Sequence, residues 1–500
     1  MLSIHQDTPP PCPDRFNMAE YVMQAGRSTP QRTALEVIGS PGDVLERWSF
    51  AQLDATIAAV AGGLAAQGLQ PGQRVGLRLG NTMDFPLVFF GAQRLGAVPI
   101  AISSQLGVKE LGPLLALTRP DMIVRDPALD LPQTDAVVVE DLAALRDHAP
   151  APLFETAADD PAYIVFTSGS SGTAKAVVHA HRAAHARRMM WPGWYELEPA
   201  DRVLHAGAFN WTFTLGTGLT DPWAAGAQAL IHVGEAGPDT HRALIAAHRP
   251  TLFAAVPGIF RRILKSDADL KTAFQGLRHA LCAGETLPAS LRAEWRDRTG
   301  TELHEAFGMS EISTFISSSP SHPAPVGTIG WVQDGRQVAV LGADQPVPRG
   351  TPGELSVHRS EPGLMLGYLN GEPLPEWFRT GDQVVMEESG AVRYLGRLDD
   401  LMTANGYRVS PLEVEAAMLT CAGVREVGVC EVSPKPGVRI IAAFYTGSAD
   451  PAEVMAELAG SLATYKMPKH IQPIPDLPRG PTGKVKRSAL PDLYIAEERS

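Results

Sequence analysis

The spacing of apolar residues changes twice along the chain, at about Ser317 and again near Leu398. Before Ser317, segments with apolar residues at three- and four-residue steps alternate with short continuous apolar runs. The clearest of them are residues 49–69 (helix), 74–79 (strand), 84–97 (helix) and 98–102 (strand). This order is typical of βαβ units, so we expect a mostly parallel sheet covered by helices.

After Ser317 the pattern changes to short strands and turns, with frequent glycine and proline. Residues 353–360 predict a strand, and residues 383–397 predict a hairpin that turns at "ESG". Near Leu398 a third pattern begins. Ser410 as N-cap and Pro411 at the first position predict a helix there. Two strands and another helix follow, so we expect a separate α+β domain of about a hundred residues.

Composition narrows the class of protein. At 500 residues, 44% of them hydrophobic and 20% charged, the chain is that of a globular protein with two or three domains. A net charge of −12 argues against a general nucleic-acid binder. The four cysteines are scattered, the N-terminus has no signal-peptide pattern and no run of 18 apolar residues occurs. We therefore expect a cytoplasmic protein with no membrane insertion.

One stretch combines glycines and hydroxyls, residues 163–181, "YIVFTSGSSGTAKAVVHAH". Backbone N–H groups of such a strip can form an anion site, and Lys175 follows it. The Walker spacing is absent, and residues 176–179 predict a strand where a Walker loop would open a helix. From these residues alone, a phosphate-binding loop and an ordinary surface loop are equally good interpretations.

Seven separated motifs then agree with one family. They are "TSGSSGTAK" (167–175), "AGETL" (283–287), "FGMSE" (307–311), "RTGD" (379–382), "GRLDD" (396–400), "NGYRVSPLEVE" (405–415) and "PTGKVKR" (481–487). In this order they resemble the adenylate-forming superfamily of acyl-CoA synthetases, peptide-synthetase adenylation domains and luciferases. Residues 209–227 and 308–318 resemble segments of benzoate-CoA ligases, and medium-chain acyl-CoA synthetases are similar as well.

The resemblance implies a fold and a reaction. The fold is α/β, with a large domain over residues 1–396 (its β-rich subdomain at about 318–396), a hinge at 397–400 and a small mobile domain over 401–500. The reaction is attack of a carboxylate on ATP to form acyl-AMP and pyrophosphate, followed by displacement of AMP by coenzyme A. We expect ATP, Mg²⁺ and coenzyme A as cofactors or co-substrates. Positioning and electrostatic stabilisation would supply most of the catalysis.

The resemblance also implies the nucleotide site. The loop and Lys175 would grip the β- and γ-phosphates, Glu311 would hold Mg²⁺, and Asp382 would accept the ribose hydroxyls. The residues expected to bind ATP or AMP are Thr167, Ser168, Gly169, Ser170, Ser171, Gly172, Thr173, Lys175, Gly284, Glu285, Phe307, Gly308, Ser310, Asp382, Arg397 and Arg408.

Three further roles follow from the family motifs. Lys484 would be the catalytic cation that bridges carboxylate and α-phosphate, alongside Glu311 and Arg397. Asp399 would be the hinge residue about which the small domain rotates between the two steps. Gly406 would let the pantetheine arm of coenzyme A pass close to the backbone.

The acid pocket is the least readable part of the site. By position its candidates are Phe209, Trp211, Phe213, Met309 and Trp331. Residues 208–219 contain no lysine or arginine, which favours an acid with an apolar tail over a dicarboxylate. Together with the resemblance, this leads us to expect an aromatic or short-to-medium-chain acid.

A histidine pattern, H-x-H-x₃-H, lies just after the glycine-hydroxyl strip. Its members are His179, His181 and His185. We expect no metal there, because the first two fall on a strand end and the third on the next helix.

Two residues depart from the family pattern. Ala174 replaces the usual proline, which loosens the turn, and Thr403 stands where many members carry a lysine that bears on the second step. Alternatives to the ligase are an enzyme that loads a carrier-protein phosphopantetheine, an inactive nucleotide-binding regulatory relative, and a luciferase-like oxygenase. Further candidate partners are a second copy of the chain and a protein acetyltransferase.

Acetylation of Lys484 is a testable consequence of the motif "PRGPTGK" (478–484), which resembles a site that protein acetyltransferases recognise. Because acetylation removes the charge, we expect loss of acyl-AMP formation, with thioester formation from preformed acyl-AMP largely kept. The two half-reactions, assayed separately on the acetylated protein, check this. Acyl-AMP formation at the full rate would refute it.

Overall fold

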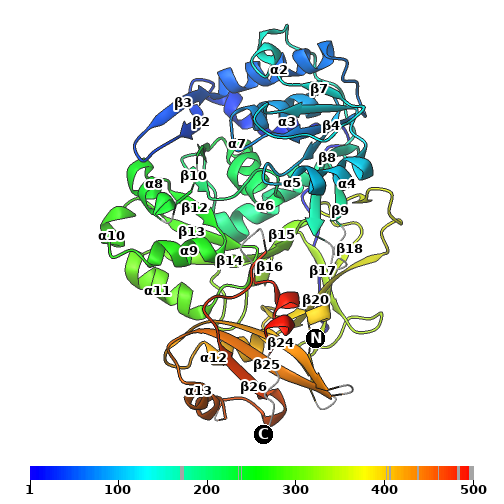
Figure 1. The fold of residues 1–500 in the computed structure, drawn as a ribbon. Helices are drawn as coiled ribbons and strands as arrows, with labels where there is room; N and C mark the ends of the chain where they lie inside the picture. Colours follow the sequence, from blue (N-terminus) through cyan, green and yellow to red (C-terminus); the bar gives the residue numbers. More distant parts are fainter. Residues whose placement is uncertain are drawn as a thin grey trace. The chain divides into compact units, whose positions relative to one another are not determined.

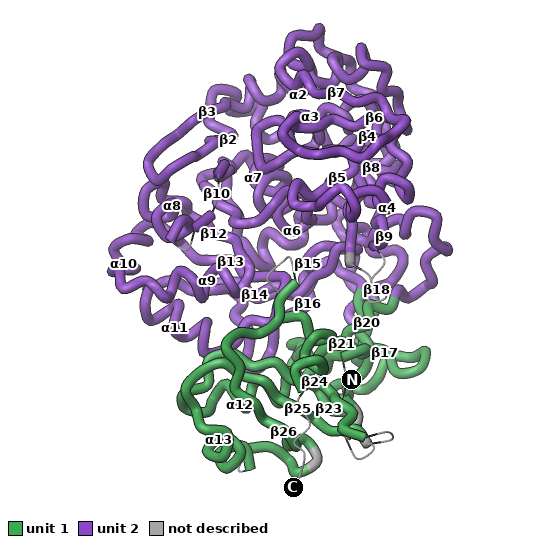
Figure 2. The backbone as a smooth tube through the Cα atoms, viewed as in Figure 1, with its two compact units in different colours: residues 1–4, 338–356, 379–500 green, residues 5–337, 357–378 purple. Residues whose placement is uncertain are grey.

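A computed structural model describes residues 1–168, 174–234, 236–237, 239–400, 402–404, 407–435, 438–459, 461–480 and 485–494. The chain divides into two compact units (Figure 2). Unit 1 contains residues 1–4, 338–356 and 379–500, and unit 2 contains residues 5–337 and 357–378. Residues 397–400 remain the predicted hinge.

A first sheet of unit 2 has, within the described residues, seven strands in the order β19-β9-β8-β5-β4-β6-β7. From β8 to β7 all neighbours are parallel, whereas β9 and β19 add antiparallel strands at one edge. The strands are β4 (Arg74–Arg78), β5 (Val98–Ala101), β6 (Met122–Arg125), β7 (Val137–Val139), β8 (Pro161–Ser168), β9 (Ala174–Ala180) and β19 (Gly367–Tyr368).

The second sheet of unit 2 has nine strands in its described part, in the order β16-β15-β14-β13-β12-β10-β11-β2-β3. Its centre, from β14 to β2, is parallel, and its two ends are antiparallel. The strands are β2 (Thr33–Ile38), β3 (Val44–Ser49), β10 (Arg202–His205), β11 (Gln228–His232), β12 (Leu252–Ala255), β13 (His279–Ala283), β14 (Glu302–Met309), β15 (Ser313–Ser317) and β16 (Trp331–Val332).

Helices connect these strands, as the βαβ pattern predicted. They are α1 (Met18–Gln24), α2 (Phe50–Ala66), α3 (Asp84–Arg94), α4 (Val108–Thr118), α5 (Arg182–Ala186), α6 (Thr212–Leu215), α7 (Asp221–Ala224), α8 (Thr240–His248), α9 (Pro257–Leu264), α10 (Leu270–Ala273) and α11 (Ala289–Thr299). Figure 1 shows α8 to α11 beside β12 and β13. None of the described helices has the length and apolar character that crossing a bilayer requires.

Helix α2 shows how the local sequence sets these elements. Ser49 and Gln52 form a capping box, in which each side chain accepts the other's backbone N–H, at 3.2 and 2.9 Å. The apolar residues that follow at helical spacing are buried, and the helix packs on α3. Gly68, with φ +97°, ends the segment where a left-handed conformation is required.

The core of the nine-stranded sheet has an aromatic centre on its α8–α11 side. Phe253 of β12, Phe260 of α9 and Trp295 of α11 meet edge to face, with ring centroids 5.6 and 4.9 Å apart. A second cluster contains Trp194 and Phe213 together with residues of β10, β12 and β13. The sheet is therefore covered by apolar side chains on both sides, as expected of a parallel sheet.

The remaining strands form a five-stranded sheet, order β1-β17-β18-β20-β21, a two-stranded sheet of β22 and β23, and a three-stranded sheet, order β24-β25-β26, in the described residues. They are β1 (Ile4–Gln6), β17 (Gln337–Leu341), β18 (Pro352–His358), β20 (Trp377–Met386), β21 (Val392–Arg397), β22 (Met402–Ala404), β23 (Tyr407–Val409), β24 (Val424–Lys435), β25 (Val438–Gly447) and β26 (His470–Pro473). Helices α12 (Pro411–Met418) and α13 (Pro451–Leu458) accompany the last sheet.

The predicted start of α12 is correct in position, but the capping bond is absent. Ser410 precedes the helix with extended backbone, and Pro411 is its first residue. The Ser410 hydroxyl instead donates to the carbonyl of Leu395 in β21. A tertiary acceptor has thus replaced the helix N-terminus as the partner of this side chain.

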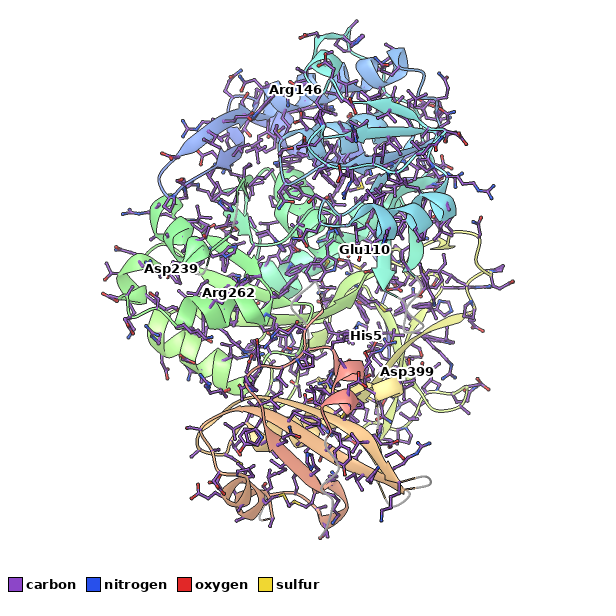
Figure 3. All side chains as sticks on the ribbon, in the orientation of Figure 1. His5, Glu110, Arg146, Asp239, Arg262 and Asp399 are labelled. Carbon is purple, nitrogen blue, oxygen red and sulfur yellow. The ribbon has the colours of Figure 1, made fainter. Side chains whose placement is uncertain are left out.

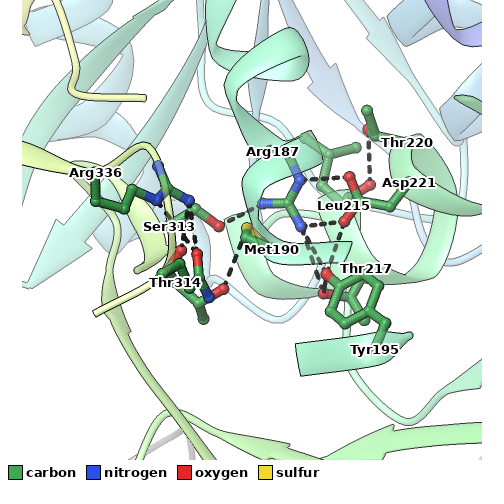
Figure 4. Close-up of polar contacts among 11 residues, drawn as sticks. Arg187, Met190, Tyr195, Leu215, Thr217, Thr220, Asp221, Ser313, Thr314 and Arg336 are labelled. Carbon is green, nitrogen blue, oxygen red and sulfur yellow. Dashed lines mark hydrogen bonds and ion pairs between the residues drawn. The ribbon is translucent and has the colours of Figure 1, made fainter. Parts of the chain in front are cut away.

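A buried ion pair organises the interior of unit 2 (Figure 4). Arg187, in a short 3₁₀ segment (Arg187–Met189), donates two hydrogen bonds to the carboxylate of Asp221, at 2.8 and 2.6 Å. Tyr195 donates its hydroxyl to the same carboxylate at 2.7 Å, and Arg187 also donates to the Ser313 hydroxyl. Both charges are buried, so each needs the other and their polar neighbours to offset desolvation.

A second buried carboxylate, Glu305 of β14, has weaker compensation. It accepts the Leu287 N–H at 2.9 Å and an Arg292 N–H at 3.1 Å. Burial raises the pKa of Glu305 to about 7, although both hydrogen bonds oppose the shift. The folded chain therefore holds a proton on Glu305 at pH values where the unfolded chain has released it.

Glu305→Gln tests this assignment. Because the pKa is raised in the folded state, Glu305 stabilises the fold least above pH 7, and its contribution falls as the pH rises from about 4.5 to about 7. At about 1.4 kcal/mol per pKa unit, we expect the wild-type free energy of unfolding to fall by roughly 3 kcal/mol relative to the variant across that range. Denaturant unfolding of both proteins at pH 5 and pH 8 measures the difference. If the free energies of unfolding of the two proteins changed equally between pH 5 and pH 8, the assignment would be contradicted.

Candidate active site

The glycine-hydroxyl strip, residues 163–181, contains most of β8 and all of β9, which pair antiparallel. Thr167 pairs with Lys175 and Ser168 with Ala174, so the strand predicted for residues 176–179 is confirmed. The predicted phosphate ligands Gly169, Ser170, Ser171, Gly172 and Thr173 lie outside the described residues. Lys175 is exposed, and its Nζ lies 4.7 Å from the ring centroid of Tyr368.

The "FGMSE" motif forms the end of β14 and the turn into β15. Phe307 packs edge to face on Phe315, with centroids 5.6 Å apart. At Gly308 an added Cβ would lie 2.2 Å from the Ser313 carbonyl oxygen, so only glycine fits there. Ser310 and Glu311 follow in the turn, and the Ser310 carbonyl accepts a hydrogen bond from Nε2 of His179 at 2.7 Å.

The carboxylate of Glu311 is buried and hydrogen-bonded. Tyr368 donates its hydroxyl to Oε1 at 2.8 Å, and the Met365 N–H donates to the Glu311 backbone carbonyl at 2.8 Å. A carboxylate fixed in this way fits the hard-oxygen ligand that Mg²⁺ prefers. The described residues contain no cluster of three protein ligands for a metal. The role of Glu311 as a Mg²⁺ ligand stays a prediction.

The "AGETL" loop follows β13. Gly284 has φ +95°, and a Cβ there would lie 2.8 Å from the Trp211 ring. The backbone N–H of Leu287 is held by the buried Glu305. Gly284 and Glu285 are both partly exposed in this loop, and their adenine contacts stay predictions.

In unit 1, Asp382 and Arg397 face each other across β20 and β21. Arg397 donates to Oδ2 of Asp382 at 3.2 Å and to the Thr380 carbonyl at 2.8 Å, while Tyr394 donates to Oδ1 at 2.8 Å. Burial raises the pKa of Asp382 above its ordinary value, although Arg397 and Tyr394 oppose the shift. Gly381, inside β20, has φ +76°, and an added Cβ there would lie 2.8 Å from the guanidinium of Arg397.

Only some of the residues predicted for the hinge, the coenzyme A arm and catalysis lie within the described residues. Asp399, labelled in Figure 3, lies exposed in a one-turn 3₁₀ helix (Leu398–Asp400). Gly406 and Lys484 lie outside the described residues, and so do the side chains of Ser168 and Arg408. Their roles stay predictions.

The acid-pocket candidates separate into groups. Trp211 and Phe213 meet edge to face at 5.4 Å, and Trp211 adjoins Gly284, so these three come together. Phe213 also packs in the buried core beside His205. The other candidates have different neighbours: Phe209 lies by Phe85, Met309 pairs with Ser313 and Trp331 stacks on His322. An acid pocket at these residues stays a prediction.

The three histidines occupy separate environments. His179 is the next-to-last residue of β9 and stacks on Tyr163 with ring centroids 4.7 Å apart. His181 accepts the Met18 N–H on Nδ1 at 3.0 Å, and His185 lies in α5 beside Phe16. Burial lowers the pKa of His179 and of His181 to about 4, so both are neutral at pH 7.

Sequence reasoning did not identify three residues that hold the candidate site residues in place. They are Tyr368 on Glu311, His179 on Ser310 and Tyr394 on Asp382. Each acts through strand pairing or a turn that residue spacing does not show. Of these contacts, the sequence could have indicated only one feature. Because side chains of a strand alternate between its two faces, His179 and Val177 must share one face of β9 and Val178 must lie on the other.

The chain is similar in sequence and in structure to known CoA ligases. A 4-hydroxybenzoate–CoA/benzoate–CoA ligase from Rhodopseudomonas palustris is 29% identical over 488 residues, which cover 89% of each chain. The crystal structure of a benzoate CoA ligase from Burkholderia xenovorans LB400 has a TM-score of 0.83 at 26% identity, covering 95% of this chain and 99% of that one. The crystal structure of ATP-bound MatB from Rhodopseudomonas palustris has a TM-score of 0.87 at 25% identity, covering 96% and 99%.

Family models account for most of the chain. The model of the AMP-binding enzyme family matches residues 22–369, and that of the AMP-binding enzyme C-terminal domain matches residues 413–484. The α/β fold and the superfamily predicted from the motifs are confirmed. With the first match alone spanning more than half of its length, the chain belongs to the family of AMP-binding enzymes.

Proposed function

We propose that the chain is an ATP-dependent carboxylic acid:CoA ligase that acts on an aromatic or short-to-medium-chain acid. The observation that carries the proposal is the Glu311 turn. A buried carboxylate and the lysine of the glycine-hydroxyl strip contact the same side chain, Tyr368. A fixed anion and a nearby cation at such a strip suit the binding of a metal–polyphosphate complex.

In the first step, a carboxylate oxygen of the acid attacks the α-phosphorus of ATP, and the bond to the departing pyrophosphate breaks. Lys175 and the strip before it would hold the β- and γ-phosphates. Asp382 would accept the ribose hydroxyls, and Lys484 would lie between the reacting carboxylate and phosphate. A bound Mg²⁺ would offset charge on the phosphates, and Glu311 would hold it.

In the second step, the thiol of coenzyme A releases its proton to water and its sulfur attacks the acyl carbonyl. The bond between the acyl carbon and the AMP oxygen then breaks, and AMP leaves. Gly406 would give the pantetheine arm its close approach to the backbone. The hinge at Asp399 would let residues of the small domain exchange places between the two steps. Relatives that are benzoate–CoA ligases support coenzyme A as the acceptor.

The acid itself is inferred from the apolar candidates. Trp211 and Phe213 form an aromatic corner next to Gly284, in a segment without lysine or arginine. Such a surface suits an aromatic ring or an alkyl tail and offers no partner for a second carboxylate. The relatives named for benzoate and hydroxybenzoates support the same class.

ATP–pyrophosphate exchange tests the proposal with a panel of benzoates and short- to medium-chain aliphatic acids. We expect exchange with at least one of them, and CoA-dependent release of AMP with the same acid. Glu311→Gln and Asp382→Asn should each lower the exchange rate by about 100-fold or more, because each removes a fixed charge at the site.

Arg15→Ala is the matched control. It removes a charge from an ion pair with Glu155 in which both side chains are more than 70% exposed, so exchange should be unchanged. Exchange without use of CoA would point to a carrier protein as acceptor. Binding of ATP without exchange on any acid would favour the regulatory relative and overturn the ligase.

A further inference from the structure

Tyr368 contacts two residues that the family motifs single out, although no motif includes it. Its hydroxyl donates to Oε1 of Glu311 at 2.8 Å. The Nζ of Lys175 lies 4.7 Å from the centroid of its ring, within the range of a cation–π contact. One side chain therefore touches both the candidate metal ligand and the candidate phosphate ligand.

We propose that Tyr368 is a positioning residue, whose hydroxyl orients the Glu311 carboxylate for the metal ion and whose ring holds the Lys175 ammonium for the phosphates. The inference rests on the proposed function, in which Glu311 binds Mg²⁺ and Lys175 binds ATP. It adds a residue that touches neither the ion nor the nucleotide and acts through the two that do.

Strand pairing fixes the position of the Tyr368 ring. In β19, Tyr368 lies opposite Val177 and Gly367 opposite Val178 of β9. The N–H groups of Leu366 and Leu369 donate to the carbonyls of Val178 and Ala176, each at 2.8 Å. Since β9 also carries Lys175, the ring and the ammonium are held by the same short piece of sheet.

The backbone of Glu311 is held by the same two segments. The Met365 N–H, just before β19, donates to the Glu311 carbonyl at 2.8 Å. His179, at the end of β9, donates to the Ser310 carbonyl at 2.7 Å. With the backbone fixed at both residues, the Tyr368 hydroxyl acts on the remaining freedom, which is the rotation of the Glu311 side chain.

The two contacts of Tyr368 can be separated by substitution. Tyr368→Phe removes the hydroxyl and keeps the ring, and Tyr368→Leu removes both. Loss of a group that orients a metal ligand commonly weakens metal binding by ten- to a hundredfold. Loss of an exposed cation–π contact has a smaller effect, about two- to fivefold.

The test measures Mn²⁺ binding to the full-length protein with ATP by electron paramagnetic resonance, and ATP binding in EDTA by calorimetry, with no acid or CoA present. For Tyr368→Phe we expect Mn²⁺ binding weakened about tenfold and metal-free ATP binding unchanged. Tyr368→Leu should also weaken metal-free ATP binding about threefold. Thermal midpoints of both variants verify that they fold.

Two controls distinguish positioning from a general loss of stability. Tyr445→Phe removes another tyrosine hydroxyl bond, the 2.6 Å contact to the Ala449 carbonyl, and should leave Mn²⁺ binding unchanged. In a Glu311→Gln background, where the ATP phosphates still coordinate Mn²⁺, Tyr368→Phe should cause no further loss.

The inference would be overturned if Tyr368→Phe bound Mn²⁺ as tightly as the wild type. It would also be overturned if Tyr368→Phe weakened Mn²⁺ binding by the same factor in the Glu311→Gln background as in the wild type. Either result leaves the ligase proposal standing as long as the wild type binds Mn²⁺ and ATP. A wild-type protein that binds neither would overturn both.

Discussion

The turn between β14 and β15 holds a carboxylate inside the protein, and contacts from several separate segments of unit 2 fix that turn. Glu311 is buried and receives a hydroxyl hydrogen bond from Tyr368. The next residues follow a constrained path, in which Ser313 takes φ +71°, a left-handed conformation that costs energy for a residue with a Cβ. Arg187 donates to the Ser313 hydroxyl and is itself neutralised by Asp221. The buried ion pair thus stabilises a turn that would otherwise relax.

A neutral histidine, His179, also holds this turn, through its hydrogen bond to the Ser310 carbonyl. Burial lowers the pKa of His179 to about 4, so at pH 7 the ring carries one proton. The Ser310 carbonyl can only accept, which places that proton on Nε2. A neutral donor therefore holds the Ser310 backbone without placing a second charge next to the buried Glu311.

Local sequence patterns predicted most of the fold, and the order of the motifs predicted the family. Contacts between segments that are distant in the sequence could not be predicted. Helix α2 follows from its capping box and apolar spacing, and β9 from the short run of residues 176–179. Tyr368 could not be found this way, because its role requires β19 to pair with β9 and to meet a turn 57 residues away in sequence. Ser410 shows the same limit, since its hydroxyl donates to the Leu395 carbonyl and does not form the predicted capping bond. Phe213, predicted for the acid pocket, also packs in the core, which composition does not reveal.

Asp382 and Arg397 were predicted as separate nucleotide contacts, but their chemistry is coupled. Accepting two ribose hydroxyls requires an ionised carboxylate, and burial raises the pKa of Asp382 and so favours its neutral form. The attraction of Arg397 and the hydrogen bond from Tyr394 oppose this shift. Removing Arg397 would therefore raise the pKa of Asp382 further, in addition to removing any contact of its own. If Asp382 binds the ribose as proposed, a loss of nucleotide binding in an Arg397 variant would have two origins, and only the one that acts through Asp382 would weaken as the pH rises.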